Sequence, residues 1–98
     1  MLNYTLQNRD MIYSEQEYNT MNTTKLCCAS SDYIYEVVNV TGISRARLSE
    51  LGFTKNTEVR VVRHLAHNGP IEIAIRDFHI ALRHEEAENI TVKISERI

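Results

Sequence analysis

The chain has 98 residues, 43% of them apolar and 24% charged, which is enough for one small globular domain. Its formal net charge is −2, and its Lys and Arg residues are mixed with Glu, so no broad basic surface is predicted for binding nucleic acid. No stretch approaches the roughly 18 consecutive apolar residues of a membrane span, and the first residues lack the pattern of a signal peptide. We therefore expect a cytoplasmic protein that is not itself inserted into the membrane.

Residues 1–24 differ in composition from the rest of the chain. They are rich in Asn, Thr, Gln and Tyr, and their apolar residues are scattered without an amphipathic period. We expect a mobile N-terminal extension here, with only a transient turn of helix between Met11 and Tyr18. The pattern of predicted strands and helices starts only after this segment, so we hypothesise that the natural protein starts at Met21. The intact mass of the native protein would test this hypothesis.

Cys27 and Cys28 are adjacent in the sequence. Their Cα atoms lie about 3.8 Å apart across a trans peptide, below the usual disulfide range of roughly 4.4–6.8 Å, so a disulfide between them would be strained. We expect two reduced thiols with one side chain buried. Metal binding by this pair alone is predicted to be weak, because no second cysteine pair or close histidine completes a tetrahedral set.

A strand followed by a short helix is the first predicted unit of the domain. Tyr33–Val40 is aromatic and β-branched, a composition typical of strands. The helix is expected over Arg45–Leu51 with Ser44 as its N-cap, because a serine hydroxyl can accept a hydrogen bond from a free amide of the first turn. Ile43 and Leu48 are expected to pack together as a hydrophobic staple at the same end.

The end of this helix and the turn after it carry strong local signals. Gly52 occupies the position where the backbone must become left-handed, and Phe53 is placed to pack on Leu48 in a Schellman ending. Asn56 then stands where a type II turn needs a positive φ, and asparagine is the best residue there after glycine. The next strand is expected over Glu58–Leu65.

The C-terminal residues predict three more strands. Apolar residues alternate with polar ones in each of them, so one face of each strand is expected to be buried: 71–76, 79–82 and 89–94. Asp77 and Phe78 are expected to turn the chain between the first two, and Arg83–Ala87 to form a single helical or 3₁₀ turn. About five short strands, one short α-helix and this turn predict an all-β fold, a small barrel whose closure hides the strand edges.

Three motifs of this chain resemble one protein family. Residues 26–94 are similar to the ferrous iron transport protein A (FeoA) family, and the most specific matches are Arg-x-x-Leu-x-x-Leu-Gly-Phe, Gly-Pro-Ile and Leu-Arg-x-x-Glu-Ala, at Arg45–Phe53, Gly69–Ile71 and Leu82–Ala87. The resemblance implies an SH3-like barrel for residues 25–98. It also implies a small cytosolic accessory protein of a bacterial ferrous-iron uptake system, which binds and supports or regulates a FeoB-type membrane permease with a cytosolic GTP-binding domain.

Two turn positions depart from the family pattern. Members of the family usually carry glycine before the second strand and before the fourth, where this chain has Asn56 and Asp77. Both residue types tolerate the left-handed conformation better than other non-glycine residues do. Both turns are therefore expected to survive at a small cost in strain.

Neither the motifs nor the composition predict catalysis. There is no nucleophile elbow and no glycine-rich phosphate loop, and the chain has only three glycines. The acidic run at 85–88 is expected to be a solvated surface. Imidazole can bind Fe²⁺ or Zn²⁺, but His64, His67, His79 and His84 are expected to give no more than a weak surface site. We therefore assign no catalytic residues, no cofactor and no metal ligands.

A binding surface is the remaining functional prediction. Leu48 and Leu51 are expected to pack against the barrel, which leaves the polar side of the helix exposed. Partner contacts are predicted on this polar side and in the following loop, at Arg45, Arg47, Ser49, Glu50 and Lys55. Whether the barrel also forms a weak homo-oligomer through its strand edges stays open.

A second function is a metal-responsive regulatory module, because similar SH3-like domains occur at the C-terminus of iron-dependent repressors. Such repressors need a DNA-binding winged helix, and the residues before the first strand are too few to form one. Only a separate DNA-binding chain would rescue this alternative. A permease gene beside this one would favour the first function, and a repressor gene would favour the second.

Overall fold

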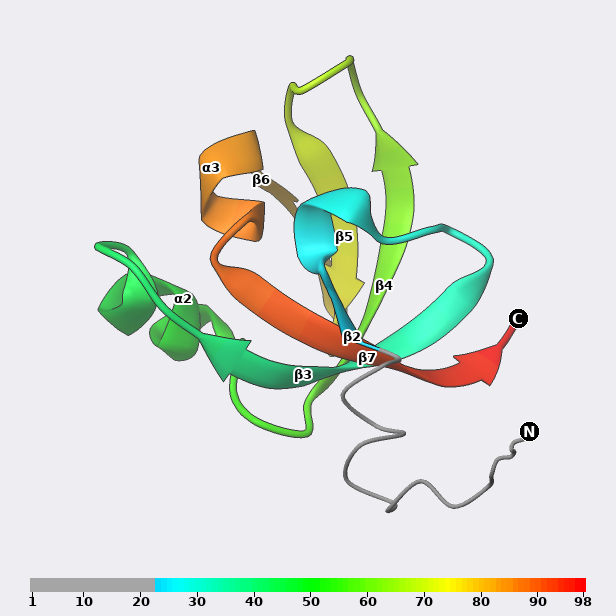
Figure 1. Cartoon of the computed structure of the whole chain (residues 1–98), viewed down its shortest axis with the longest axis horizontal. Helices are drawn as coiled ribbons and strands as arrows, with labels where there is room; N and C mark the ends of the chain where they lie inside the picture. The colour runs from blue at the N-terminus through cyan, green and yellow to red at the C-terminus, as the bar shows by residue number, and fades with distance from the viewer. Residues whose placement is uncertain (1–22) are drawn as a thin grey trace, which may run out of the picture.

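The computed structural model describes residues 23–98, which form a six-stranded antiparallel sheet with three short helical segments (Figure 1). The strands are β2 (Thr23–Lys25), β3 (Tyr33–Val40), β4 (Glu58–His64), β5 (Ile71–Ile75), β6 (Phe78–Leu82) and β7 (Ile90–Arg97). The helical segments are the 3₁₀ turn η1 (Leu26–Cys28) and the α-helices α2 (Arg45–Leu51) and α3 (His84–Ala87). No helix within residues 23–98 is long and apolar enough to cross a membrane.

The strands follow the order β2-β7-β3-β4-β5-β6, so β7 lies between β2 and β3. The long pairing of β3 with β7 joins the two ends of the domain, with Val37 opposite Val92. Register shifts interrupt this pairing between Ile34 and Tyr35 and between Val37 and Asn39. Such irregularities bend and twist a strand. Figure 1 shows β3 and β7 curving across the molecule, while β4 and β5 extend away from them as a hairpin.

One apolar core fills the inside of the curved sheet. In β4, β5 and β7 the buried side chains alternate with more exposed ones, as strand geometry requires. The helical segments add Leu26 from η1, Leu48 from α2 and Ala87 from α3, and all three are fully buried. The strand residues of this core are Tyr35, Val37, Val40, Val59, Val61, Ile71, Ile73, Ile75, Leu82, Ile90 and Val92. The predicted all-β architecture is therefore confirmed.

The predicted strands are present, with shifted ends and one addition. β3 has the predicted bounds, whereas β7 begins at Ile90 and continues to Arg97. The sequence pattern does not predict β2, whose three polar residues become a strand by pairing with β7. The predicted helical or 3₁₀ turn at Arg83–Ala87 is the α-helix α3. The 3₁₀ turn of the structure is η1, which lies elsewhere in the chain. Ile94 is 42% exposed although the alternation places it inward, and it lies beyond Lys93, the last β7 residue that pairs with β2.

The predicted N-terminal extension lies almost wholly outside the described residues. Residues 1–22 are not among those that the structure describes, so the expectations for residues 11–18 and for a start at Met21 stay predictions. Thr23 and Thr24 were expected in the extension, but they belong to β2 and pair with Lys93 and Val92. The sheet therefore includes two residues that were predicted to lie before the domain.

The C-terminal end of α2 has the predicted geometry. Gly52 has φ +114°, and the Phe53 N–H donates to the Leu48 carbonyl at 3.0 Å, the outer hydrogen bond of a Schellman ending. Leu48 and Phe53 are both fully buried, so the helix end is anchored in the core. Asn56 has φ +73°, as predicted, and its N–H donates to the Val37 carbonyl at 2.7 Å, which fixes the turn to β3.

The prediction for the turn between β5 and β6 is wrong. Arg76 and Asp77 form this turn, and the residue with a positive φ is Arg76 (+53°) rather than Asp77. Because Ile75 pairs with Phe78, only two residues remain to reverse the chain direction. Two-residue hairpin loops need a positive φ at their first central position, whichever residue stands there. Phe78 consequently belongs to β6 and not to the turn.

Candidate functional site

The loop that enters α2 differs from the predicted cap. Ser44 has near-helical backbone angles (φ −86°, ψ 10°) instead of the extended ones of an N-cap, and its side chain makes no capping hydrogen bond. Backbone groups close the first turn: the Arg45 N–H donates to the Gly42 carbonyl at 3.2 Å, and the Leu48 N–H to the Ser44 carbonyl at 2.9 Å. Ile43 is fully exposed instead of packing on Leu48, so the predicted staple is wrong.

A constrained loop holds this exposed isoleucine. The Thr41 N–H donates to the Asn89 carbonyl at 2.9 Å, which ties the loop to the residue before β7. Gly42 has φ +91°, and a Cβ atom there would lie 2.5 Å from Asn89 Nδ2, so the bend needs glycine for both its angle and its space. Ile43 is therefore exposed to solvent at a defined position. The neighbouring surface determines which kind of partner could bind there.

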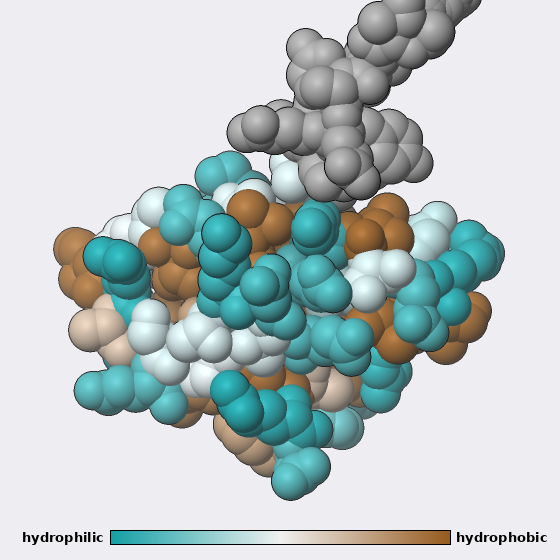
Figure 2. Space-filling model, turned by 90° about the horizontal axis from the view of Figure 1, so that it is seen from below, coloured by the Kyte–Doolittle hydropathy of each residue, from teal (hydrophilic) through white to brown (hydrophobic). Residues whose placement is uncertain are grey.

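A hollow of about 450 Å³ lies beside Ile43, and we call it the α2–α3 groove. The α2 entry loop, the first residues of α3 and the residue before β7 line it: Gly42, Ile43, Ser44, Arg83, Glu85, Glu86 and Asn89. Figure 2 shows hydrophobic surface at the left edge of the molecule, the side on which α2 lies in Figure 1, among hydrophilic side chains. The groove therefore combines one apolar contact with a rim of charged groups.

An ion pair joins α2 to α3 at this groove. Arg47 Nη1 binds Glu86 Oε2, and the two side chains are 55% and 14% exposed. The other carboxylate oxygen of Glu86 accepts a hydrogen bond from the Arg83 N–H at 3.0 Å, so the same side chain caps the start of α3. Glu86 thus fixes the position of α3 relative to α2, and part of the donor capacity of Arg47 is used within the domain.

The predicted contact residues lie at the surface, with Ser49 half-buried and the others exposed: Arg45, Arg47, Glu50 and Lys55. Leu48 is buried and Leu51 is half-buried against the core, so the predicted division of α2 into a packed and an exposed side is confirmed. The contact role of the exposed residues stays a prediction. Ile43 was also expected on the packed side of α2. It follows Gly42 directly and lies outside the helical period of Leu48 and Leu51, and this position could have shown that it does not share their packed face.

Two of the histidines have hydrogen-bond partners of their own. His79 Nδ1 lies 3.2 Å from Glu72 Oε2, and the same carboxylate accepts a hydrogen bond from Arg63 Nε at 2.8 Å. Arg63 first, and His79 second, hold the pKa of Glu72 below its usual value. His64 Nε2 donates to the Ala29 carbonyl at 3.1 Å. These hydrogen bonds give His79 and His64 structural roles within the fold.

A second hollow, of about 410 Å³, is lined by residues from η1, from the region of the β4–β5 loop and from α3: Cys27, Cys28, His64, Ala66, His67, Asn68, Gly69 and His84. Both cysteines of the chain and three of its four histidines therefore surround one space. Sequence spacing does not predict this grouping, because the three segments are far apart along the chain and meet only in the folded domain.

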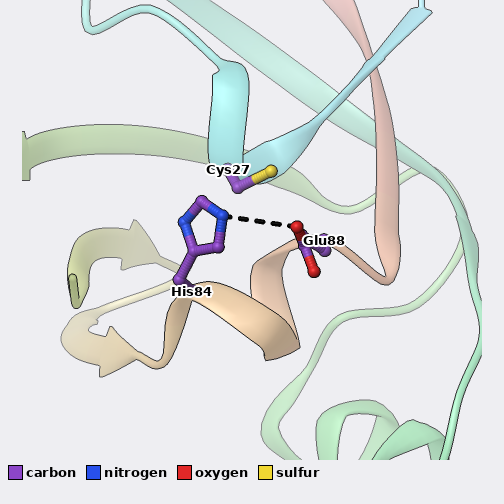
Figure 3. Close-up of side chains that lie close together, drawn as sticks. All are labelled: Cys27, His84 and Glu88. Carbon is purple, nitrogen blue, oxygen red and sulfur yellow. Dashed lines mark ion pairs between the residues drawn. The ribbon is translucent and has the colours of Figure 1, made fainter. Parts of the chain in front are cut away.

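Beside this hollow, Cys27, His84 and Glu88 form a tighter group, which we call the Cys-His-Glu cluster (Figure 3). One ligand atom from each lies within 4.8 Å of the other two, and His84 Nε2 is 3.4 Å from Glu88 Oε2. Both thiols are free, as predicted, with Cys27 half-buried and Cys28 exposed. Burial, followed by Cys28 and then the charge of Glu88, raises the pKa of the Cys27 thiol to about 11.

The chain matches known proteins over most of the described residues. A family model described as the FeoA domain matches residues 25–94. The solved FeoA protein of Chlorobium tepidum is 32% identical and superposes with a TM-score of 0.66, covering 72% of this chain and 70% of that chain. FeoA of Stenotrophomonas maltophilia, solved in complex with zinc and described as an SH3 domain protein, is 28% identical, covering 71% of this chain and 89% of that chain with a TM-score of 0.64. No curated protein matches the chain.

A transcriptional repressor shares the same fold. This manganese-dependent protein is 18% identical and has a TM-score of 0.64, and the match covers 74% of this chain and 42% of the repressor. At that identity the likeness shows the fold alone. The FeoA domain match, together with the SH3 domain relative, confirms both the SH3-like barrel and the family that the sequence motifs indicated. The chain therefore belongs to the FeoA family.

Proposed function

We propose that this protein is a small accessory protein of a ferrous-iron uptake system, which binds the cytosolic GTP-binding domain of a FeoB-type permease and supports or regulates transport. Membership of the FeoA family supports the role in iron transport. A role as a ferrous iron transport activating factor has also been suggested for the S. maltophilia relative. Binding of this kind would recruit the protein from the cytoplasm to the inner face of the membrane.

The observation that carries the docking proposal is the fully exposed Ile43 beside the α2–α3 groove. The bonds between Thr41 and Asn89 keep its loop in one conformation, so little conformational entropy is lost when a partner covers it. Burying an isoleucine side chain contributes about 1.5–3 kcal/mol, which is roughly tenfold to hundredfold in affinity. The exposed Arg45 at the start of α2 and the exposed Lys55 in the loop after it favour a partner surface that carries acidic groups around an apolar pocket.

Binding, and not catalysis, is the activity that this surface supports. Glu86, the less exposed of the two carboxylates that line the groove, already serves the fold, since it pairs with Arg47 and accepts the Arg83 N–H. A general acid or base needs a free position from which it reaches a substrate. We therefore attribute no chemical step to the groove.

Titration of the full chain with the purified cytosolic domain of the permease, with and without guanine nucleotide, tests the docking proposal. Ile43→Ser should weaken binding by about tenfold or more, because it removes the apolar anchor. Charge reversal of Arg45 and Arg47 together should also weaken binding. Ile43→Ser should leave the thermal unfolding midpoint nearly unchanged, because this side chain is exposed. Reversal of Arg47 also breaks its ion pair with Glu86 and should lower the midpoint, so binding is measured at a temperature at which both variants are folded.

Ile98→Ser is the matched control, because it removes another exposed isoleucine (64% exposed) that does not line the groove. It should leave the affinity unchanged. Wild-type affinity in both the Ile43 and the arginine variants would move the interface to another part of the barrel. An equal loss in Ile98→Ser would mean that apolar surface in general, and not this loop, drives the association.

The alternative function, a metal-responsive regulatory module, has weaker support. Its support is the fold shared with the manganese-dependent repressor. Within residues 23–98 the longest helix is α2, with seven residues, which is shorter than the recognition helices that enter the major groove of DNA. Co-purification of a DNA-binding protein, and not of the permease, from the native cell would reverse this preference.

A further inference from the structure

We propose that the Cys-His-Glu cluster binds one divalent transition-metal ion of borderline softness, such as Zn²⁺ or Fe²⁺, through Cys27 Sγ, a ring nitrogen of His84 and the Glu88 carboxylate (Figure 3). The docking proposal does not depend on this site. Thiolate, imidazole and carboxylate are the side chains that bind Zn²⁺ in proteins. Because such sites follow the Irving–Williams order, we expect tighter binding of Zn²⁺ than of Fe²⁺.

The distances between the three ligand atoms fit one metal ion. Metal–ligand bonds of about 2.0–2.3 Å in a tetrahedron place neighbouring ligand atoms roughly 3.3–3.8 Å apart. His84 Nε2 and Glu88 Oε2 are already 3.4 Å apart, and all three atoms lie within 4.8 Å of one another. Figure 3 shows the His84 ring and the Glu88 carboxylate facing each other, with the Cys27 side chain beside them. The adjoining hollow of about 410 Å³ gives water access to the fourth position.

The fold holds these ligands in place before any ion binds. The Glu88 N–H donates to the His84 carbonyl at 3.0 Å, and this single helical turn puts both side chains on one side of α3. The buried Leu26 and Ala87 anchor η1 and α3 in the core next to the ligands, and η1 packs against α3. Preorganisation of this kind lowers the entropy cost of binding an ion.

The charges around the cluster are mixed. The Glu88 carboxylate pairs with His84, and the Lys25 ammonium donates to the Glu88 backbone carbonyl at 3.3 Å. Coordination deprotonates a thiol, so binding of an ion through Cys27 would release a proton.

Co²⁺ is a suitable spectroscopic probe of this site. Added to the reduced full chain after treatment with a chelator, Co²⁺ should give a thiolate-to-cobalt charge-transfer band and the strong visible bands of tetrahedral coordination. The signal should saturate at one equivalent, and Zn²⁺ should displace it. Cys27→Ser should abolish the charge-transfer band, and His84→Ala and Glu88→Gln should each weaken Co²⁺ binding by at least about tenfold.

Matched controls use the same residue types outside the cluster. His79→Ala and Glu85→Gln should keep wild-type Co²⁺ affinity, since His79 pairs with Glu72 and Glu85 lines the α2–α3 groove. Binding without a charge-transfer band, or equal affinity in wild type and His84→Ala, would overturn the proposal. Equal losses in His79→Ala would do so as well. If thermal unfolding shows that Cys27→Ser is misfolded, the wild-type band and the Glu88→Gln and His84→Ala variants decide the question.

Discussion

Within residues 23–98 three non-glycine residues have positive φ angles, and two of them, Asn56 and Arg76, lie in the turns before β4 and β6. Asn56 has φ +73° and Arg76 has φ +53°. A residue with a Cβ atom loses roughly 1–2 kcal/mol in this region, and asparagine loses less because its short polar side chain can bond locally. The strain predicted for Asp77 is thus carried by Arg76, a longer side chain without that compensation. The second turn is the more strained of the two.

Asn56→Ala should lower the free energy of unfolding by about 1 kcal/mol, because alanine does not share the tolerance of asparagine for φ +73°. The main-chain hydrogen bond from residue 56 to Val37 is available to either residue. Asn56→Gly is the control and should cost much less. Chemical denaturation of both variants measures the difference, and equal stabilities would show that φ does not select the residue at this position.

Among the elements, α2 depends on a single buried side chain. Leu48 is fully buried, and its carbonyl accepts the Phe53 N–H that ends the helix. Leu48→Ala should therefore lower the free energy of unfolding by about 2–5 kcal/mol, through lost burial and the cavity that remains. Leu51→Ala, at a half-buried position of the same helix, should cost distinctly less. Denaturant titration compares the two, and equal costs would contradict this account of the anchor.

The ladder between β4 and β5 carries a charged pair with a measurable titration. Arg63 lies opposite Glu72 in the register and is the main cause of the lowered pKa of that carboxyl, with His79 second. Arg63→Met should therefore raise the pKa of Glu72, which NMR titration of the carboxyl measures. Arg60→Met, at the β4 position opposite Ala74, should leave it unchanged.

The direction of the pH effect on stability follows from the same pair. Because folding lowers the pKa of Glu72, its interactions stabilise the fold fully above the unfolded-state pKa and are lost as the pH falls through the folded-state pKa. As the pH falls through the folded-state pKa, the wild type should lose the stabilising interaction between Arg63 and Glu72. Arg63→Met lacks this interaction at every pH, so its stability should fall less over the same pH range. Parallel acid-unfolding curves for the two proteins would contradict this.

Sequence reasoning succeeded where neighbouring residues decide the structure. The ending of α2 at Gly52 and the turn at Asn56 depend on backbone angles that local residue types control, and both predictions are confirmed. It failed where contacts between segments far apart in the sequence determine the structure. The bond from Thr41 to Asn89 turns the α2 entry loop, and with it Ile43, away from the helix. The strand β2 exists because β7 provides its partner, and the local composition contains no sign of that pairing.

Across the whole molecule, the pairing of β2 with β7 explains why the Cys-His-Glu cluster could not be predicted. Lys25 at the end of β2 lies opposite Thr91 near the start of β7, so the segment after β2 meets the segment before β7. Those segments are η1 and α3. Helical spacing relates His84 to Glu88 within the sequence, but only the sheet topology adds Cys27.

The sheet order also limits how copies of the domain could associate. Within residues 23–98, β2 and β6 are the two ends of the order, so a homo-oligomer formed by strand pairing would use one of them. Whether the domain self-associates weakly is a question that the sequence leaves open. Sedimentation over a range of concentrations would measure it.

The short helix α3 is shared by both proposed sites. Glu85 and Glu86 line the α2–α3 groove, while His84 and Glu88 belong to the Cys-His-Glu cluster. One helical turn is too short to shift at one site without shifting at the other. If both ligands bind, thermodynamic reciprocity requires that the factor by which a metal ion changes the affinity for the permease equals the factor by which the permease changes the affinity for the ion. The four-residue helix α3 would then couple the two binding equilibria, so that metal binding changes the affinity for the permease and permease binding changes the affinity for the metal ion.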